Sequence, residues 1–176
     1  ESSLLLLQLT HVINMMKDHY NQVRICPYHG TNLHSDGSNV TSFHAYCDLR
    51  LDSDLTKIME RSRNEEELRY VWSEFREKIG PPIRNTFMRY VDLSNQAAQE
   101  HGFRDAGEQM RELYEDPDFF FTVQDLWTKI QPLYKQLFTY VRRGLHRKYG
   151  SSVVRPDGPI PAHILGNMSG QNWRNI

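Results

Sequence analysis

The sequence has 176 residues, of which 21 are Lys or Arg and 22 are Asp or Glu, so its formal net charge at pH 7 is −1. This length favours one domain, and the near-neutral charge gives no electrostatic reason to expect binding to nucleic acid or to an anionic membrane. The leucine run at residues 4–7 is too short to cross a bilayer, and no basic segment precedes it as in a signal peptide.

A first helix is predicted over residues 4–23. Apolar side chains recur there at steps of three and four, which is the spacing of one helical face. They are Leu5, Leu9, Val12, Met16, Tyr20 and Val23.

The stretch between Cys26 and Cys47 is the least regular part of the chain. It is rich in Gly, Pro, Ser, Asn and Asp, which predicts an exposed loop. The loop contains the sequon Asn39-Val40-Thr41, so Asn39 is a candidate glycosylation site. Two cysteines around such a loop favour an oxidising compartment, and we therefore expect an extracellular protein. The histidines of the loop are irregularly spaced, which favours a solvated loop over a metal site.

Two helices are predicted between residues 52 and 80. Asp52 and Ser53 begin a short one. Asn64 is a good N-cap for the second, because glutamates fill its first turn, where negative charge is favoured. Gly80 is expected to end it. The buried stripe should be Leu68, Trp72, Phe75 and Ile79.

Two prolines follow directly. Pro81 and Pro82 suit the first turn of a helix, so the sequence predicts a new helix over residues 81–101, with Gly102 as its stop. Asp105 with Glu108 resembles a further N-terminal cap, and that helix should end near residue 116.

The longest predicted helix covers residues 122–149. Thr122 can cap its start, Pro132 should bend it near Thr128, and Gly150 supplies the stop. Its length would be about 40 Å, and so long an apolar stripe needs other helices beside it. Its apolar face is Val123, Leu126, Trp127, Ile130, Leu133, Tyr134, Leu137, Phe138, Val141 and Leu145. Since no strand of useful length appears, we expect an all-α fold of long packed helices.

Four segments carry a resemblance to a known family. They are Tyr140-Val-Arg-Arg-Gly-Leu-His-Arg-Lys-Tyr-Gly150, Gly158-Pro-Ile-Pro-Ala-His-Ile-Leu-Gly-Asn-Met168, Tyr90-Val-Asp-Leu-Ser-Asn-Gln-Ala-Ala98, and Ser62-Arg63 with Val71-Trp72. They resemble the angiotensin-converting enzyme family, the zinc peptidyl-dipeptidases, whose members are secreted or membrane-anchored. The resemblance runs from about residue 4 to residue 176, with an inserted loop at 27–46.

The resemblance implies that residues 1–176 are part of a single, mostly helical catalytic domain with a substrate cleft. It also implies a disulfide between Cys26 and Cys47. Catalysis in that family needs a zinc-polarised water and a glutamate base. The family's His-Glu-x-x-His zinc motif does not occur in these residues. We therefore expect an internal fragment that is inactive alone and needs the remainder of the catalytic domain.

The resemblance also assigns candidate site residues. Gln171 falls on the glutamine that binds the C-terminal carboxylate of the peptide substrate, and Asn172 and Asp52 fall on residues lining the pockets for its last two side chains. From the sequence alone, Asp52 fits a helix-start acid better. Arg76 and Tyr114 fall on chloride-binding residues. Their alternatives are a surface ion pair for Arg76 and core packing for Tyr114.

Two functions remain open at this stage. The first is a partial zinc peptidyl-dipeptidase that removes C-terminal dipeptides from extracellular peptides. The second is a non-catalytic member of the family that binds peptides or partners. Ser169 and Gly170 stand where relatives have a tryptophan and an alanine, and this pair and the inserted loop lend weight to the second function. Met110 stands where relatives have another tryptophan, and the loss of these large side chains weakens the transfer of the family's site residues to this chain.

Overall fold

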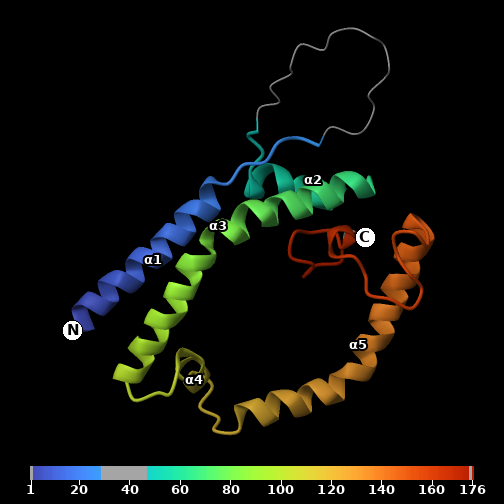
Figure 1. The fold of residues 1–176 in the computed structure, drawn as a ribbon. Helices are drawn as coiled ribbons and strands as arrows, with labels where there is room; N and C mark the ends of the chain where they lie inside the picture. The colour runs from blue at the N-terminus through green and yellow to red at the C-terminus, as the bar shows by residue number, and fades with distance from the viewer. Residues whose placement is uncertain (1, 29–46, 175) are drawn as a thin grey trace. The chain divides into compact units, whose positions relative to one another are not determined.

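The computed structural model describes residues 2–28, 47–174 and 176. Within these residues the named elements are helices, and there is no strand (Figure 1). The elements are α1 (Ser2–Gln22), the π-helical turn η1 (Leu51–Leu55), α2 (Thr56–Arg61), α3 (Glu65–Glu100), α4 (Ala106–Glu112), α5 (Phe119–Tyr149) and the 3-10 turn η2 (Ala162–Ile164). The predicted all-α class is confirmed. The candidate glycosylation site Asn39 lies outside the described residues.

The chain divides into two compact units. Unit 1 contains Glu1–Tyr20 and Gly80–Tyr140, and unit 2 contains Asn21–Ile79 and Val141–Ile176. The helices α3 and α5 each contribute to both units, because the boundaries fall within them.

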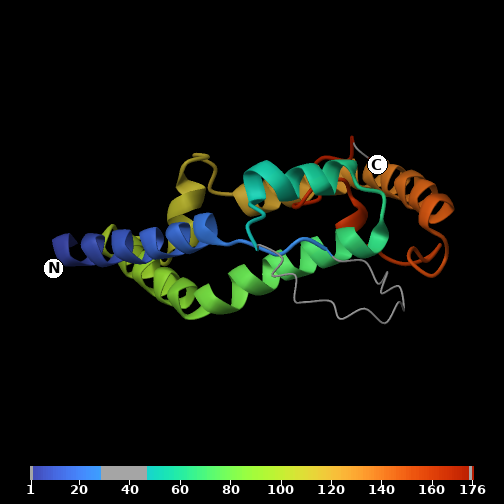
Figure 2. The ribbon, with the colours of Figure 1, turned by 90° about the horizontal axis from the view of Figure 1, so that it is seen from above.

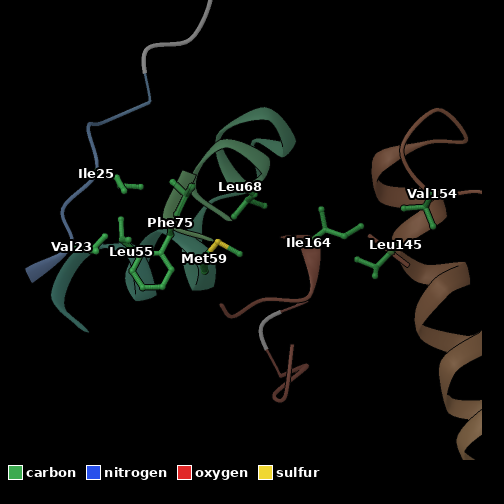
Figure 3. Close-up of a cluster of buried hydrophobic side chains, with 10 residues drawn as sticks. Val23, Ile25, Leu55, Met59, Leu68, Phe75, Leu145, Val154 and Ile164 are labelled. Atoms are coloured by element: carbon green, nitrogen blue, oxygen red, sulfur yellow. The ribbon is translucent and has the colours of Figure 1, made fainter. Parts of the chain in front are cut away.

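The main hydrophobic core lies in unit 2. Its buried side chains are Val23, Ile25, Leu55, Met59, Leu68, Val71, Phe75, Leu145, Val154 and Ile164. Figure 3 shows Ile164 of η2 between the side chains from η1, α2 and α3 on one side and Leu145 with Val154 on the other. Burying a side chain of this size stabilises the folded state by about 1.5–3 kcal/mol. The core therefore includes the C-terminal segment as well as the helices.

A covalent and hydrogen-bonded closure joins the two sides of the inserted loop. Cys26 and Cys47 form a disulfide, as the resemblance implies. Next to it, Ile25 and Leu49 exchange two backbone hydrogen bonds of 3.2 Å. The Tyr70 hydroxyl of α3 donates to the carbonyl of Cys26 at 3.2 Å. The base of the loop is thus attached to α3.

Two predicted helix caps are confirmed. Asn64 Oδ1 accepts the backbone N–H groups of Glu66 and Glu67 at 3.0 and 3.3 Å, at the start of α3. Asp105 Oδ1 accepts the N–H of Glu108 at 2.8 Å, at the start of α4. This backbone hydrogen bond, with help from Arg104, lowers the pKa of the Asp105 carboxyl below its ordinary value.

The predicted break between two helices at residues 80–82 is wrong. Figures 1 and 2 show α3 as one uninterrupted helix. Its range, Glu65–Glu100, includes Gly80, Pro81 and Pro82. Gly80 lacks the positive φ with which a glycine ends a helix, whereas Gly102, the confirmed stop, has φ +86°. The prolines cost two hydrogen bonds within the helix, but they do not end it.

The predicted start of the long helix is also wrong, by one turn. Helix α5 begins at Phe119, before Thr122. The preceding turn is set by Asp116, whose Oδ1 accepts the N–H of Asp118 at 2.8 Å and whose carbonyl accepts the N–H of Phe119 at 3.1 Å. The end of α5 is as predicted, since Gly150 has φ +84°.

The apolar face of α5 is not covered over most of its length. Between residues 123 and 137, its exposed fractions run from 40% at Trp127 to 68% at Leu133. Trp127 and Tyr134 contact each other instead, with ring centroids 5.4 Å apart. Only near the end of the helix is Leu145 buried, at 3%. The expectation of neighbouring helices along the whole stripe thus fails for this part of unit 1. In the described part of the chain, no helix has the length and apolarity needed to cross a bilayer.

Candidate functional site

The segment that contains most candidate site residues follows α5 and begins with polar contacts to that helix. The imidazole Nδ1 of His146 lies 2.6 Å from the carbonyl oxygen of Val154. Arg142 Nη1 donates to the carbonyl of Gly158 at 3.1 Å. The basic residues in the last turns of α5 therefore fold the chain back onto its own helix.

Next, η2 fixes the segment against α3. Ile164 is 2% exposed within the core. His163 Nε2 lies 2.7 Å from Glu65 Oε1, and the two side chains are only 13% and 19% exposed. Sequence reasoning missed this pair. The only signal was that His163 lies in the Gly-Pro-x-Pro-Ala-His motif, which carried the resemblance.

A tight turn follows, and Asn167 shapes it. Its Oδ1 accepts the N–H of Gln171 at 3.2 Å, and its Nδ2 donates to the carbonyl of Asn172 at 3.3 Å. Gly170 has φ +66°, and a Cβ there would lie 3.2 Å from Cδ1 of Leu165. The turn therefore favours glycine at residue 170.

The side chains of Gln171 and Asn172 are both exposed. Asn172 Oδ1 accepts the N–H of Arg174 at 3.0 Å. In the described part of the chain, the carboxamide of Gln171 makes no hydrogen bond; only its backbone N–H does. Gln171 thus has a fixed backbone and a side chain that is available to a ligand. We call residues 167–173 the amide turn.

Arg76 attaches the amide turn to α3. Its Nη2 donates to the carbonyl of Met168 at 2.5 Å, and its Nη1 lies 3.2 Å from Met168 Sδ. Nη1 also donates to the carbonyl of Trp72 at 3.1 Å, and the guanidinium carbon lies 3.6 Å from the centroid of the Trp72 ring. Neither the chloride role nor the surface ion pair considered from the sequence anticipates this contact.

The structure does not bring Asp52 to this turn. Asp52 has an 81% exposed side chain, lies 3.9 Å from Nε of Arg50, and makes no hydrogen bond or ion pair with the amide turn among the described residues. Its neighbour Asp54 is the better-held carboxylate. The N–H of Arg50 donates to it at 3.0 Å, and this bond lowers the pKa of Asp54.

Tyr114 belongs to a different unit from Arg76. Its side chain is 64% exposed, and its ring stacks on Phe119 with centroids 4.3 Å apart. Core packing therefore does not account for Tyr114. Chloride binding by Tyr114 and chloride binding by Arg76 remain predictions.

A resident zinc ion, which the resemblance implies, has no matching donors in the described residues. No three side chains among their His, Cys, Asp and Glu lie close enough together to bind a metal ion. The sequence as a whole lacks the His-Glu-x-x-His motif. No step of a zinc mechanism can be assigned to these residues.

Comparison with known proteins covers almost the whole chain. Residues 4–176 match the model of the peptidase M2 family, described as angiotensin-converting enzyme. Angiotensin-converting enzyme of Rattus norvegicus is 48% identical over 139 residues, which are 79% of this chain and 10% of that protein. Angiotensin-converting enzyme of Haematobia irritans exigua is 37% identical over 169 residues, 96% of this chain and 26% of that protein.

A third relative is the angiotensin-converting enzyme-like protein Ace3 of Mus musculus. It is 38% identical over 171 residues, 97% of this chain and 21% of that protein. The chain thus spans between 10% and 26% of the length of these relatives. On the family match and on the coverage of the chain, this protein belongs to the angiotensin-converting enzyme family of peptidases.

Proposed function

We propose that this chain supplies one wall of the substrate site of a zinc-dependent peptidyl-dipeptidase, which removes C-terminal dipeptides from extracellular peptides. In this proposal the amide turn binds the C-terminal end of the peptide. The zinc ligands and the catalytic glutamate come from the remainder of the catalytic domain, so the 176 residues alone have no peptidase activity.

The observation that carries the proposal is the state of Gln171. Its backbone is held by Asn167, while its carboxamide is exposed and makes no hydrogen bond within the described residues. A carboxamide N–H₂ can donate to a carboxylate, and it places no charge in the site when the peptide is absent. This is the arrangement expected of a residue that recognises a free peptide C-terminus.

The other site assignments are parts of the same proposal. Asn172, the next residue of the turn, is proposed to line the pocket for the last side chain of the peptide. Asp52 is proposed to line the pocket for the penultimate one. We also propose a chloride-binding role for Tyr114 and Arg76, a glycan on Asn39, and an extracellular location, to which the Cys26–Cys47 disulfide is suited.

The test is Gln171→Ala in the complete catalytic domain. Removing a donor to a charged carboxylate costs about 1–3 kcal/mol, so kcat/KM for peptides with a free C-terminus should fall about fivefold to 150-fold. Peptides amidated at the C-terminus should lose much less, because they lack the carboxylate. Gln136→Ala, at an exposed position of α5, is the matched control and should affect neither peptide class.

The decisive quantity is the ratio of the two losses in kcat/KM. A ratio near one would show that Gln171 acts only on folding and would remove it from the site. A domain that binds free-terminus peptides through Gln171 but cleaves neither class would instead favour the non-catalytic member. Gly170 and the exposed Ser169 are the residues that favour this second function.

A further inference from the structure

Arg76 reaches the amide turn through the main chain. Its Nη2 donates to the carbonyl oxygen of Met168, three residues before Gln171. Its Nη1 also lies 3.2 Å from the sulfur of Met168. A hydrogen bond to a main-chain carbonyl restrains the backbone itself. Arg76 therefore restrains the backbone of the amide turn, from which the Gln171 side chain extends.

The guanidinium is itself held by α3. Nη1 donates to the Trp72 carbonyl at 3.1 Å, and the guanidinium carbon lies 3.6 Å from the centroid of the Trp72 ring. On the same helix, Val71 and Phe75 are in the buried core, with exposed fractions of 0% and 4%. A planar guanidinium can donate to several groups at once, which the ammonium group of lysine cannot do in the same geometry. Arg76 thus connects a core helix rigidly to the amide turn.

Asn167 has a separate task. Both of its hydrogen bonds, to Gln171 and to Asn172, stay inside the turn. They fix the shape of the turn, but they do not fix its place on α3. Among the described residues, Arg76 makes the polar contacts from α3 to Met168 of the turn.

We infer that Arg76 is a positioning residue for peptide recognition, which holds the amide turn against α3 through the Met168 carbonyl and so places the Gln171 carboxamide for the peptide carboxylate. The inference rests on the proposed function for what Gln171 binds. The contacts that carry it go to groups of this chain, so we expect the effect of Arg76 on the turn to be independent of a bound anion. In this respect it differs from the chloride role implied by the resemblance.

The first test uses hydrogen exchange in the 176-residue chain. The reporters are the amides of Gly170, Gln171 and Arg174, whose hydrogen bonds do not involve Arg76. Losing hydrogen bonds to a charged group should accelerate their exchange about tenfold or more in Arg76→Ala. Unchanged exchange at these three amides would overturn the inference.

Two further variants separate positioning from folding. Arg84→Ala changes an exposed arginine of the same helix and should leave the reporters unchanged. Arg76→Lys keeps the charge but not the fork of donors, so it should lose part of the protection. The amide of Val154, which is bonded to the Gly150 carbonyl in the core region, should stay protected in Arg76→Lys. If Val154 loses protection equally, Arg76 supports the whole fold and the positioning role is wrong.

The second test uses the complete catalytic domain. Arg76→Lys should raise KM for peptides with a free C-terminus about threefold to tenfold, with kcat nearly unchanged. The same increase should appear in chloride buffer and in chloride-free acetate buffer. A defect that disappears without chloride would show that Arg76 acts on the peptide through a bound anion and not through the Met168 carbonyl, and it would overturn the inference. If Gln171→Ala lowers kcat/KM equally for free and amidated peptides, the proposed function fails. The exchange experiment still decides whether Arg76 holds the turn.

Discussion

Replacing the prolines of α3 tests whether this helix is continuous. Pro81 and Pro82 are exposed and lie inside α3. In an unbroken helix, their nitrogens would face the carbonyls of Glu77 and Lys78, to which neither can donate. A proline in a helix interior costs about 3 kcal/mol relative to alanine. If a helix instead began at Pro81, the missing N–H groups would be among those left unpaired anyway, and there would be little cost.

The expected gain follows from two opposing terms. Proline also restricts the unfolded chain, so its replacement by alanine gives back about 0.4–1 kcal/mol to the unfolded state. Each substitution should therefore raise the free energy of unfolding by about 2 kcal/mol. Because the residues are adjacent and share one distortion of the helix, the double variant should gain less than the sum of the two.

Urea unfolding followed by far-ultraviolet circular dichroism measures this change. Pro132→Ala, inside α5, should behave in the same way. Pro156→Ala, at an exposed turn residue outside the helices, should be slightly destabilising, since only the unfolded-state term remains. If Pro81→Ala and Pro82→Ala match Pro156→Ala in sign, the chain has two helices here, as the sequence predicts, and the continuous α3 is wrong.

Two further predictions concern the disulfide and a helix cap. Cys26→Ser with Cys47→Ser should lower the free energy of unfolding by about 3 kcal/mol, since the disulfide closes a loop with a sequence separation of 21 residues; equal urea midpoints for the wild type and the double variant would contradict this. The lowered pKa of Asp105 means that its cap stabilises α4 at pH values above the ordinary carboxyl range and is lost as the pH falls through the lowered pKa. The Glu108 amide should then exchange faster, relative to its intrinsic rate, as the pH falls from about 5 to about 2. Asp105→Asn keeps an acceptor oxygen but cannot titrate, so it should abolish this pH dependence. An unchanged dependence in that variant would assign the effect to another group.

The sequence predicted the features that depend on local chemistry. Asn64, Asp105 and Gly150 act where their side chain or backbone preference places them, because a cap needs only its next few residues. The helix boundary at Pro81 was mispredicted from a local pattern. Proline directly after glycine is typical of a new helix start, but α3 continues on both sides of this pair.

Only part of the candidate site could be predicted from the sequence. Gln171 was identified by resemblance, and the structure adds that its carboxamide is exposed and makes no hydrogen bond within the described residues. The contacts of Arg76 with Met168 and of His163 with Glu65 join residues separated by 92 and 98 positions. No periodicity or spacing in the sequence reports pairs so far apart, so they become visible only once the core has placed η2 beside α3.

The closure formed by Ile25, Leu49 and the disulfide has a consequence for how this family can change. The residues on either side of segment 27–46 are joined by two backbone hydrogen bonds, between Ile25 and Leu49, and by the Cys26–Cys47 disulfide. The Tyr70 hydroxyl ties this closure to α3, whose residue Val71 is fully buried. The number of residues between Cys26 and Cys47 can therefore change, because the entropic cost of closing a loop grows only slowly with its length. The chain therefore contains a ready insertion point, at which new surface chemistry can be acquired or a foreign peptide displayed while the amide turn keeps its place.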